Sequence, residues 1–227
     1  MAIRYNKCFV EIPGGFQPRA AIGYLFFPTL LILNYLGFIS IPEKDIEECL
    51  GLIKEKCSLY SRTRKVSENK AKYLATRICD KLPVVYGSEG FLSSVAYRWK
   101  CEINENAKTP CFWAEFPELN HNETVGWQRL KDITSNLALI ILREKDEGER
   151  IKTRAEVTKN LIKESLGEII EVWVDGKSKL ARAIDALYLG DITSVYLALV
   201  NGIDPTPVDK IGVLKNELAK LGPILRE

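Results

Sequence analysis

"LPVVYGSEG", residues 82–90, decides the fold class, because an apolar strand-like run ends there in a glycine turn and a helical pattern follows near residues 91–103. The rhythm repeats through "CFWAEF" (111–116), "NLALIIL" (136–142) and "EIIEVWV" (168–174), with helical segments between them. Such alternation is typical of a parallel sheet covered by helices on both faces. The sequence therefore predicts an α/β domain whose ligand site lies in loops that follow the strands.

The remaining elements are predicted from apolar periodicity. "KCFVEI" (7–12) has the pattern of a short buried strand, and the turn "PGGFQPR" follows it. Two amphipathic helices between residues 43 and 81 predict a helical connector. Further helices are expected near 122–130 and 154–166, and two more cover most of residues 179–221.

One apolar segment, residues 21–39, has two interpretations. It runs for 19 residues without a charge, close to the ~20 residues that cross a bilayer. Pro28, Thr29 and Asn34 interrupt it, and no second run of this kind exists in the sequence. A core helix is therefore favoured over a membrane span, which stays as an alternative.

The bulk composition argues against nucleic acid, acidic membranes and metal ions as partners. The 227 residues are 46% hydrophobic and 27% charged with a net charge of +2, so no strong field directs the chain to nucleic acid or to acidic membranes. Six scattered cysteines show no Cys-x-x-Cys spacing and only one histidine accompanies them, so no metal or cofactor is expected. Without a secretory leader pattern, a cytoplasmic protein with reduced thiols is expected.

Glu105 and His121 are the candidate acid-base pair. Glu105 ends a predicted helix and His121 follows the next strand, so we expect a parallel fold to bring both toward one edge of the sheet. A carboxylate and an imidazole form a general base and a general acid, typically worth ~10²–10⁴ in rate. In the alternative, His121 caps the following helix with Asn120 and Asn122, and Glu105 only solvates a helix terminus.

Two other features are weaker signals. "YGSEG", which contains Ser88, could cradle a phosphate with its backbone N–H groups, but it matches neither common glycine-rich phosphate motif. The basic residues between Arg62 and Lys72 could contact an anion, but Glu55, Glu68 and Asp80 are interleaved around them, which favours a solvated helix face.

Four longer motifs resemble one family. "IPGGFQPRAAIGYLF", "LPVVYGSEG", "YRWKCEINENAKTPCFWAEFPELNHNETVGW" and "GDITSVYLALVNGIDPTPVDKIGVLK" are similar to the bifunctional phosphoglucose/phosphomannose isomerases of archaea and some bacteria. The resemblance implies two sugar isomerase (SIS) domains, each a three-layer αβα sandwich around a parallel sheet. Residues 1–38 would end the first domain, 39–80 would be the helical connector, and 81–227 would be the second domain.

The resemblance also implies roles for particular residues. Glu105 would move the proton between carbons 1 and 2 of the open-chain sugar through an enediol, and Arg19 would bind the substrate and stabilise the enediolate. His121 would help to open the sugar ring, reaching the site from the neighbouring subunit of a homodimer. Lys215 would assist ring opening, with Lys210 as its competitor, and Ser88 is added as a substrate-binding residue.

The resemblance further implies a cytoplasmic enzyme of glycolysis and gluconeogenesis that interconverts glucose 6-phosphate or mannose 6-phosphate with fructose 6-phosphate. The family's glycine-rich opening turn and its Ser/Thr-rich phosphate loop belong to a part of the first domain that this sequence does not contain. A chain without them is expected to be a poor enzyme, because phosphate contacts position the sugar. The alternative is a non-catalytic SIS module that binds sugar phosphate or mediates dimerisation.

Overall fold

The computed structural model describes residues 9–222 and separates into two compact units, Met1–Glu47 and Glu48–Glu227. Each unit is described by itself. The first contains the short 3-10 helix η2 (Pro18–Ala20) and helix α1 (Ile22–Tyr35). Helix α2 (Glu43–Leu59) begins in the last residues of the first unit and continues into the second unit.

Two predictions fall in the first unit. The short strand expected at residues 7–12 is wrong for Phe9–Ile12, which form no strand, while residues 7 and 8 lie outside the described part of the chain. The apolar segment forms α1, a helix of 14 residues with Pro28 inside it. At ~1.5 Å per residue α1 is ~21 Å long, which is shorter than the ~30 Å hydrocarbon core of a bilayer.

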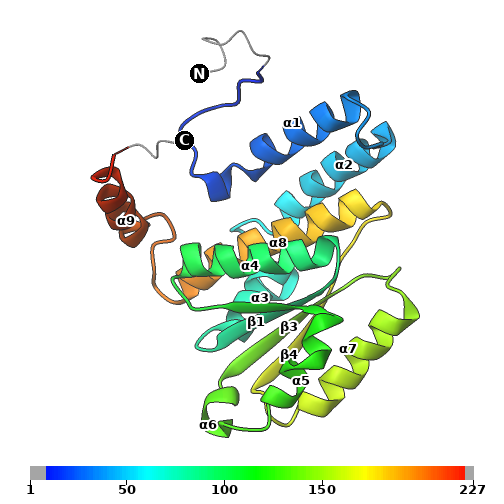
Figure 1. Cartoon of the computed structure of the whole chain (residues 1–227), viewed down its shortest axis with the longest axis vertical. Helices are drawn as coiled ribbons and strands as arrows, with labels where there is room; N and C mark the ends of the chain where they lie inside the picture. The colour runs from blue at the N-terminus through cyan, green and yellow to red at the C-terminus, as the bar shows by residue number, and fades with distance from the viewer. Residues whose placement is uncertain (1–8, 223–227) are drawn as a thin grey trace. The chain divides into compact units, whose positions relative to one another are not determined.

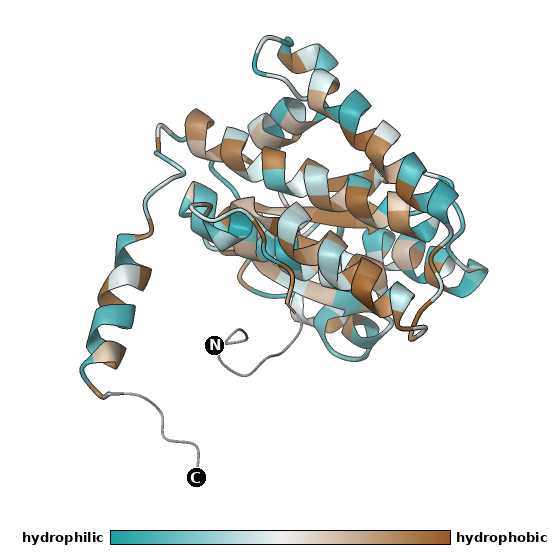
Figure 2. Cartoon of the chain, turned by 90° about the horizontal axis from the view of Figure 1, so that it is seen from above, coloured by the Kyte–Doolittle hydropathy of each residue, from teal (hydrophilic) through white to brown (hydrophobic). Residues whose placement is uncertain are grey.

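The second unit is built on four parallel strands (Figure 1). They are β1 (Leu82–Ser88), β2 (Phe112–Phe116), β3 (Leu137–Arg143) and β4 (Glu168–Trp173), in the spatial order β2-β1-β3-β4. All three neighbouring pairs are parallel, which confirms the predicted α/β sheet and all four of its strands. Figure 2 shows the strands as mostly apolar, as expected for a sheet that is buried on both faces.

Helices cover both faces of this sheet. One core packs helices α3 (Lys70–Ile78), α4 (Phe91–Ala107) and α8 (Lys179–Val200) against alternate strand residues such as Val85 and Ile140. The other core packs α7 (Glu149–Ile162) against the strand residues that point the opposite way, such as Tyr86 and Ile141. The shorter elements are η3 (Val66–Glu68), η4 (Glu118–His121), α5 (Glu123–Gly126), α6 (Lys131–Thr134) and α9 (Asp209–Ala219).

Several helix boundaries differ from prediction. The helix expected near 91–103 runs four residues further, to Ala107, where Lys108 takes a left-handed backbone conformation with φ 54°. The helix expected near 122–130 is only the four-residue α5, and Leu130 has φ 60°, which no α-helix continues through. The helix expected at 154–166 begins earlier, at Glu149.

Helix α8 is the one described helix that is long and apolar enough to cross a membrane by length and composition. Half of its apolar window is buried inside the protein, where Leu189 and Leu197 belong to the core. A core helix satisfies the same criteria, and the packing of α8 on α4 and α3 agrees with that assignment.

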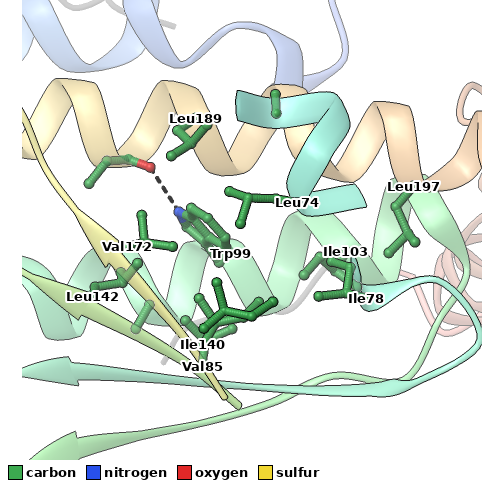
Figure 3. Packing of buried hydrophobic residues seen from close by; sticks show 14 of the residues in the cluster. Leu74, Ile78, Val85, Trp99, Ile103, Ile140, Leu142, Val172, Leu189 and Leu197 are labelled. Atoms are coloured by element: carbon green, nitrogen blue, oxygen red, sulfur yellow. Dashed lines mark hydrogen bonds between the residues drawn. The ribbon is translucent and has the colours of Figure 1, made fainter. Parts of the chain in front are cut away.

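Trp99 is the centre of the first core (Figure 3). Its side chain is fully buried among residues of α3, α4, α8 and the sheet, and its Nε1 donates to the carbonyl of Ala186 at 2.8 Å. Gly190 on α8 permits this position, because a Cβ there would lie 2.1 Å from Trp99 Nε1. The close approach of α4 to α8 therefore depends on a glycine.

We expect Gly190→Ala to destabilise the protein by ~1–3 kcal/mol, because the added methyl overlaps the Trp99 ring and forces repacking. Gly51→Ala is the matched control, since Gly51 is an exposed helical glycine with open space around its Cβ position. That control should be neutral or stabilising by up to ~1 kcal/mol. Urea unfolding of both variants checks the prediction, and equal midpoints would contradict it.

Candidate active site

Glu105 lies in the last turn of α4 and is half-buried. The turn is held at its end by Lys108, whose Nζ donates to the carbonyl of Glu105 and to that of Pro205. Asn104 donates to the carbonyl of Thr109 at 2.8 Å. The first of these contacts satisfies a carbonyl of the last helix turn, which the helix itself leaves unpaired, and the others tie the helix end to the segments that follow.

A groove of about 510 Å³ opens beside Glu105. Its walls are the end of α4, with Asn104 and Lys108, and the segment Pro207–Ile211, which contains Lys210. The groove therefore combines two carboxylates, Glu105 and Asp209, with two cationic side chains, so charged groups of both signs line it. Lys210 lines the groove, whereas Lys215 lies exposed on α9 and is not one of its lining residues.

A buried polar network lies beside Glu105, between α4 and α8. Arg98, Glu102 and Asn106 are spaced four residues apart on α4. Arg98 binds Asp191 of α8 with Nε and Nη2 at 2.9 and 2.8 Å, and its Nη2 also contacts Glu102 at 2.9 Å. Asn106 donates to Glu102 at 3.0 Å and to Ser194 at 2.8 Å. No sequence pattern indicates this network, because its two halves are far apart along the chain.

The two carboxyl groups of the network have raised pKa values. Burial, and then the negative charge of Asp191, raise the pKa of Glu102 to about 7, against the opposing effect of Arg98. Burial also raises the pKa of Asp191 to about 6, although its hydrogen bond with Arg98 acts in the other direction. One guanidinium thus pairs with two buried carboxyl groups, and their raised pKa values keep a proton in the network up to near-neutral pH.

These shifts predict how stability depends on pH. A folded carboxyl group with a raised pKa binds a proton that the unfolded chain has already released, so its contribution falls as the pH rises from ~4 to ~7. Between pH 5 and pH 8 the wild type should therefore lose ~2 kcal/mol relative to Glu102→Gln. Urea unfolding at both pH values, with the exposed Glu55→Gln as control, checks this. Parallel pH profiles of wild type and Glu102→Gln would contradict it.

His121 ends η4, directly after β2, and is exposed. Asn120 attaches this segment to α7, since it donates to Thr158 Oγ1 at 2.7 Å and accepts from Arg154 at 3.2 Å. Asn122 donates instead to Glu118, and the N-terminus of α5 receives no side-chain cap. Neither Asn120 nor Asn122 therefore caps the next helix, so that part of the helix-cap alternative is wrong.

Glu105 and His121 lie at opposite edges of the sheet within one chain. β1 and β2 run in parallel with Ser88 beside Phe116, so α4 must lead the chain back to the edge where β2 begins. Glu105 ends that helix of 17 residues, ~25 Å long, whereas His121 follows the far end of β2. The expectation that the fold brings both residues to one edge is wrong, because the helix between two parallel strands always returns to the starting edge.

Ser88 lies on the His121 edge, at the end of β1, and is half-buried. The glycine next to it has a packing role: a Cβ on Gly87 would lie 2.3 Å from the carbonyl oxygen of Leu92, so a glycine lets the chain turn tightly from β1 into α4. Arg19 lies in η2 of the first unit, also half-buried. Among the described residues, no three His, Cys, Asp or Glu side chains cluster in a way that could hold a metal ion.

A parallel sheet between helix layers places the chain in the α/β fold class, and comparison with solved structures finds the same fold. A glucose-6-phosphate isomerase like protein from Thermus thermophilus superposes with a TM-score of 0.65 and 22% identity, over 83% of this chain and 59% of that one. The glucosamine-6-phosphate deaminase of Thermotoga maritima gives a TM-score of 0.54 at 11% identity, over 84% of this chain and 54% of that one. Both likenesses concern the fold.

The sequence comparison is more specific. The chain belongs to the family described as the bacterial phospho-glucose isomerase C-terminal SIS domain, whose model matches residues 67–218. A bifunctional phosphoglucose/phosphomannose isomerase of Caldicellulosiruptor bescii is 39% identical over 212 residues, 93% of this chain and 62% of the relative. One from Aquifex aeolicus is 36% identical over 211 residues, 92% of this chain and 61% of the relative. The chain thus spans about three-fifths of the length of these relatives.

Proposed function

We propose that this chain is the part of a phosphosugar isomerase that supplies the catalytic base Glu105, and that the enzyme interconverts glucose 6-phosphate or mannose 6-phosphate with fructose 6-phosphate. The observation that carries the proposal is the position of Glu105: a half-buried carboxylate on a fixed helix turn beside a groove that two lysines and Asp209 also line. The relatives whose names state this activity are similar over nearly the whole chain.

In this mechanism Glu105 removes a proton from one of carbons 1 and 2 of the open-chain sugar and returns it to the other, through an enediol. Arg19 stabilises the negative charge that develops on the enediolate oxygens. Carbon 2 is planar in the enediol, so one base serves both epimeric aldose phosphates. The reaction needs no external oxidant or reductant: the carboxylate and imidazole of the proposed residues supply its proton transfers, and the guanidinium supplies charge stabilisation.

We propose that the active enzyme is a homodimer in which His121 opens the sugar ring in the site of the neighbouring subunit. The opposite placement of Glu105 and His121 in one chain supports this arrangement, since one chain cannot bring both to one substrate. The ring-opening lysine is Lys215 or Lys210, and the groove favours Lys210 because it lies beside Glu105. The enzyme would act in the cytoplasm, in glycolysis and gluconeogenesis, without nucleic acid or membrane as a partner.

The alternative is an SIS module that binds sugar phosphate or mediates dimerisation without catalysis. The chain spans about three-fifths of the length of the relatives whose names state the activity. Translation of the DNA upstream of Met1, in frame, separates the two proposals. A glycine-rich turn and a Ser/Thr-rich loop there, with isomerase activity of the protein expressed from the full reading frame, would support the enzyme. An inactive product of the full reading frame that still binds fructose 6-phosphate would support the module.

Subunit mixing tests the shared site. Glu105→Gln chains and His121→Ala chains, each impaired alone, should recover activity when they are mixed, because a mixed dimer holds one site with both wild-type residues. About a quarter of wild-type turnover is expected from random pairing of equal amounts, because about half of the dimers are mixed and each has one intact site of two. Isomerase assays before and after exchange of subunits measure it. No recovery, with mixed dimers demonstrated by mass, would count against a shared site.

A further inference from the structure

We propose that Asn106 is a positioning residue for Glu105, because it clamps the last turn of α4 to α8 through Glu102 and Ser194 and so fixes the direction in which the Glu105 carboxylate points. This inference rests on the proposed function of Glu105 as the base. It deepens that proposal by assigning a role to the buried polar network, which the reaction itself does not require.

Asn106 has the geometry of a clamp. Its side-chain amide carries two hydrogens, and Nδ2 donates to Glu102 Oε2 at 3.0 Å and to Ser194 Oγ at 2.8 Å. Glu102 belongs to α4 and Ser194 to α8, so the amide joins the two helices. All three side chains are buried, where each hydrogen bond is protected from water.

Both partners of Asn106 are themselves held. Ser194 Oγ donates to the carbonyl of Asp191 at 2.6 Å, which directs its lone pairs toward the Asn106 amide. The other oxygen of Glu102 binds Arg98, and Arg98 makes a bidentate pair with Asp191. The network therefore closes on itself between α4 and α8, and no member can turn without breaking a second contact.

The position of Asn106 makes this clamp relevant to the base. It is the next residue after Glu105, so the two share a peptide unit in a terminal helix turn, where helices fray. Asn106 faces the buried α8 side while the half-buried Glu105 lines the groove. Because a displacement of ~1 Å at a catalytic group can cost ~10²-fold in rate, a frayed turn would lower turnover without removing any group that binds substrate.

The test compares Asn106→Ala with Asn69→Ala in the protein expressed from its full reading frame. Asn69 is a matched control because it is equally buried and makes two hydrogen bonds, to Ser61 and from Lys72, at the N-terminus of α3. Asn106→Ala should speed amide hydrogen exchange at residues 104–108 by ~10-fold and lower kcat by ~10-fold with KM within about twofold, consistent with the loss of one to two hydrogen bonds. Asn69→Ala should change neither.

Exchanging the amide and the carboxylate between positions 106 and 102 distinguishes a positioning role from general destabilisation. Asn106→Asp alone places a second carboxylate beside Glu102 and should lower kcat further. Combining it with Glu102→Gln restores an amide-to-carboxylate hydrogen bond with the roles reversed, and should return at least part of kcat. No recovery, with the double variant folded, would count against the clamp.

The outcomes separate the two proposals. Unchanged exchange at residues 104–108 in Asn106→Ala would overturn the clamp directly, whatever the activity. Faster exchange with unchanged kcat, while Glu105→Gln is inactive, would leave the proposed function standing and overturn the positioning role. A wild type without isomerase activity would overturn the proposed function, and the positioning role with it, even if the exchange result showed that the turn is clamped.

Discussion

Glu105→Gln is expected to lower isomerase turnover by ~10² or more, because the amide keeps the shape of the side chain and removes its ability to take a proton from carbon. The groove beside Glu105 keeps its other walls in this variant, so substrate binding should change little. The loss should therefore appear in kcat, while KM stays within a few-fold of the wild type.

Glu115→Gln is the matched control for this experiment. Glu115 is also half-buried, but it lies on β2 outside the groove and should be dispensable for turnover. Steady-state assays in both directions, with glucose 6-phosphate and mannose 6-phosphate, measure the effect. Wild-type turnover in Glu105→Gln would remove Glu105 from the mechanism, since no proton transfer to an amide can replace that of a carboxylate.

Lys56→Met is expected to destabilise the second unit by ~3–5 kcal/mol, the largest stability effect predicted for a single side chain here. Lys56 is a buried residue of α2, and its Nζ lies 2.6 Å from Asp175 and 3.2 Å from Asp185. Burial alone would lower the pKa of Lys56, but the hydrogen bond to Asp175 and the charge of Asp185 raise it above its ordinary value. The ammonium therefore stays charged and pairs with two carboxylates.

The destabilisation arises because Lys56→Met leaves the carboxylate of Asp185 without the ammonium that pairs with it. The side chain of Asp185 is 1% exposed, so without Lys56 its charge is buried and keeps the hydrogen bond from the backbone N–H of Asp175 and the charge of Lys70. Lys54→Met, on the exposed face of the same helix, should change stability by less than ~0.5 kcal/mol. Lys56→Met/Asp185→Asn should recover part of the loss, because the orphaned charge is gone. Urea unfolding measures all three, and equal midpoints for the two lysine variants would contradict the account.

The sheet could be predicted from local pattern alone. The runs around Val85 and Ile140 are continuous apolar strands, and glycine or polar turns bound them, which is the signature of strands buried on both faces. The polar network could not, because Glu102 and Asp191 look like ordinary helix-surface residues until α4 and α8 are packed together. Burial, which gives these groups their raised pKa values, is a property of the fold.

The wrong expectation about Glu105 and His121 has a different origin. The pattern correctly places one residue at the end of a helix and the other after a strand. The parallel pairing that it predicts already requires the helix between the strands to reverse the direction of the chain, so the two residues could have been assigned to opposite edges. The roles of Glu105, Arg19, His121, Lys215 and Ser88 stay predictions, as does the division into residues 1–38, 39–80 and 81–227. Among these roles, the groove bears most on the choice of the ring-opening lysine, because Lys210 lines the groove and Lys215 does not.

One measurement tests the central claim most directly: incubation of the wild type and Glu105→Gln with fructose 6-phosphate in D₂O, followed by NMR of the sugar phosphates. An enediol reaction through Glu105 exchanges the moving proton with solvent, so the wild type should place deuterium on carbon 2 of the aldose phosphates. Glu105→Gln should place at least ~10²-fold less deuterium there in the same time. Equal deuterium incorporation with both proteins, or equal formation of aldose phosphates by both, would contradict the assignment of Glu105 as the base.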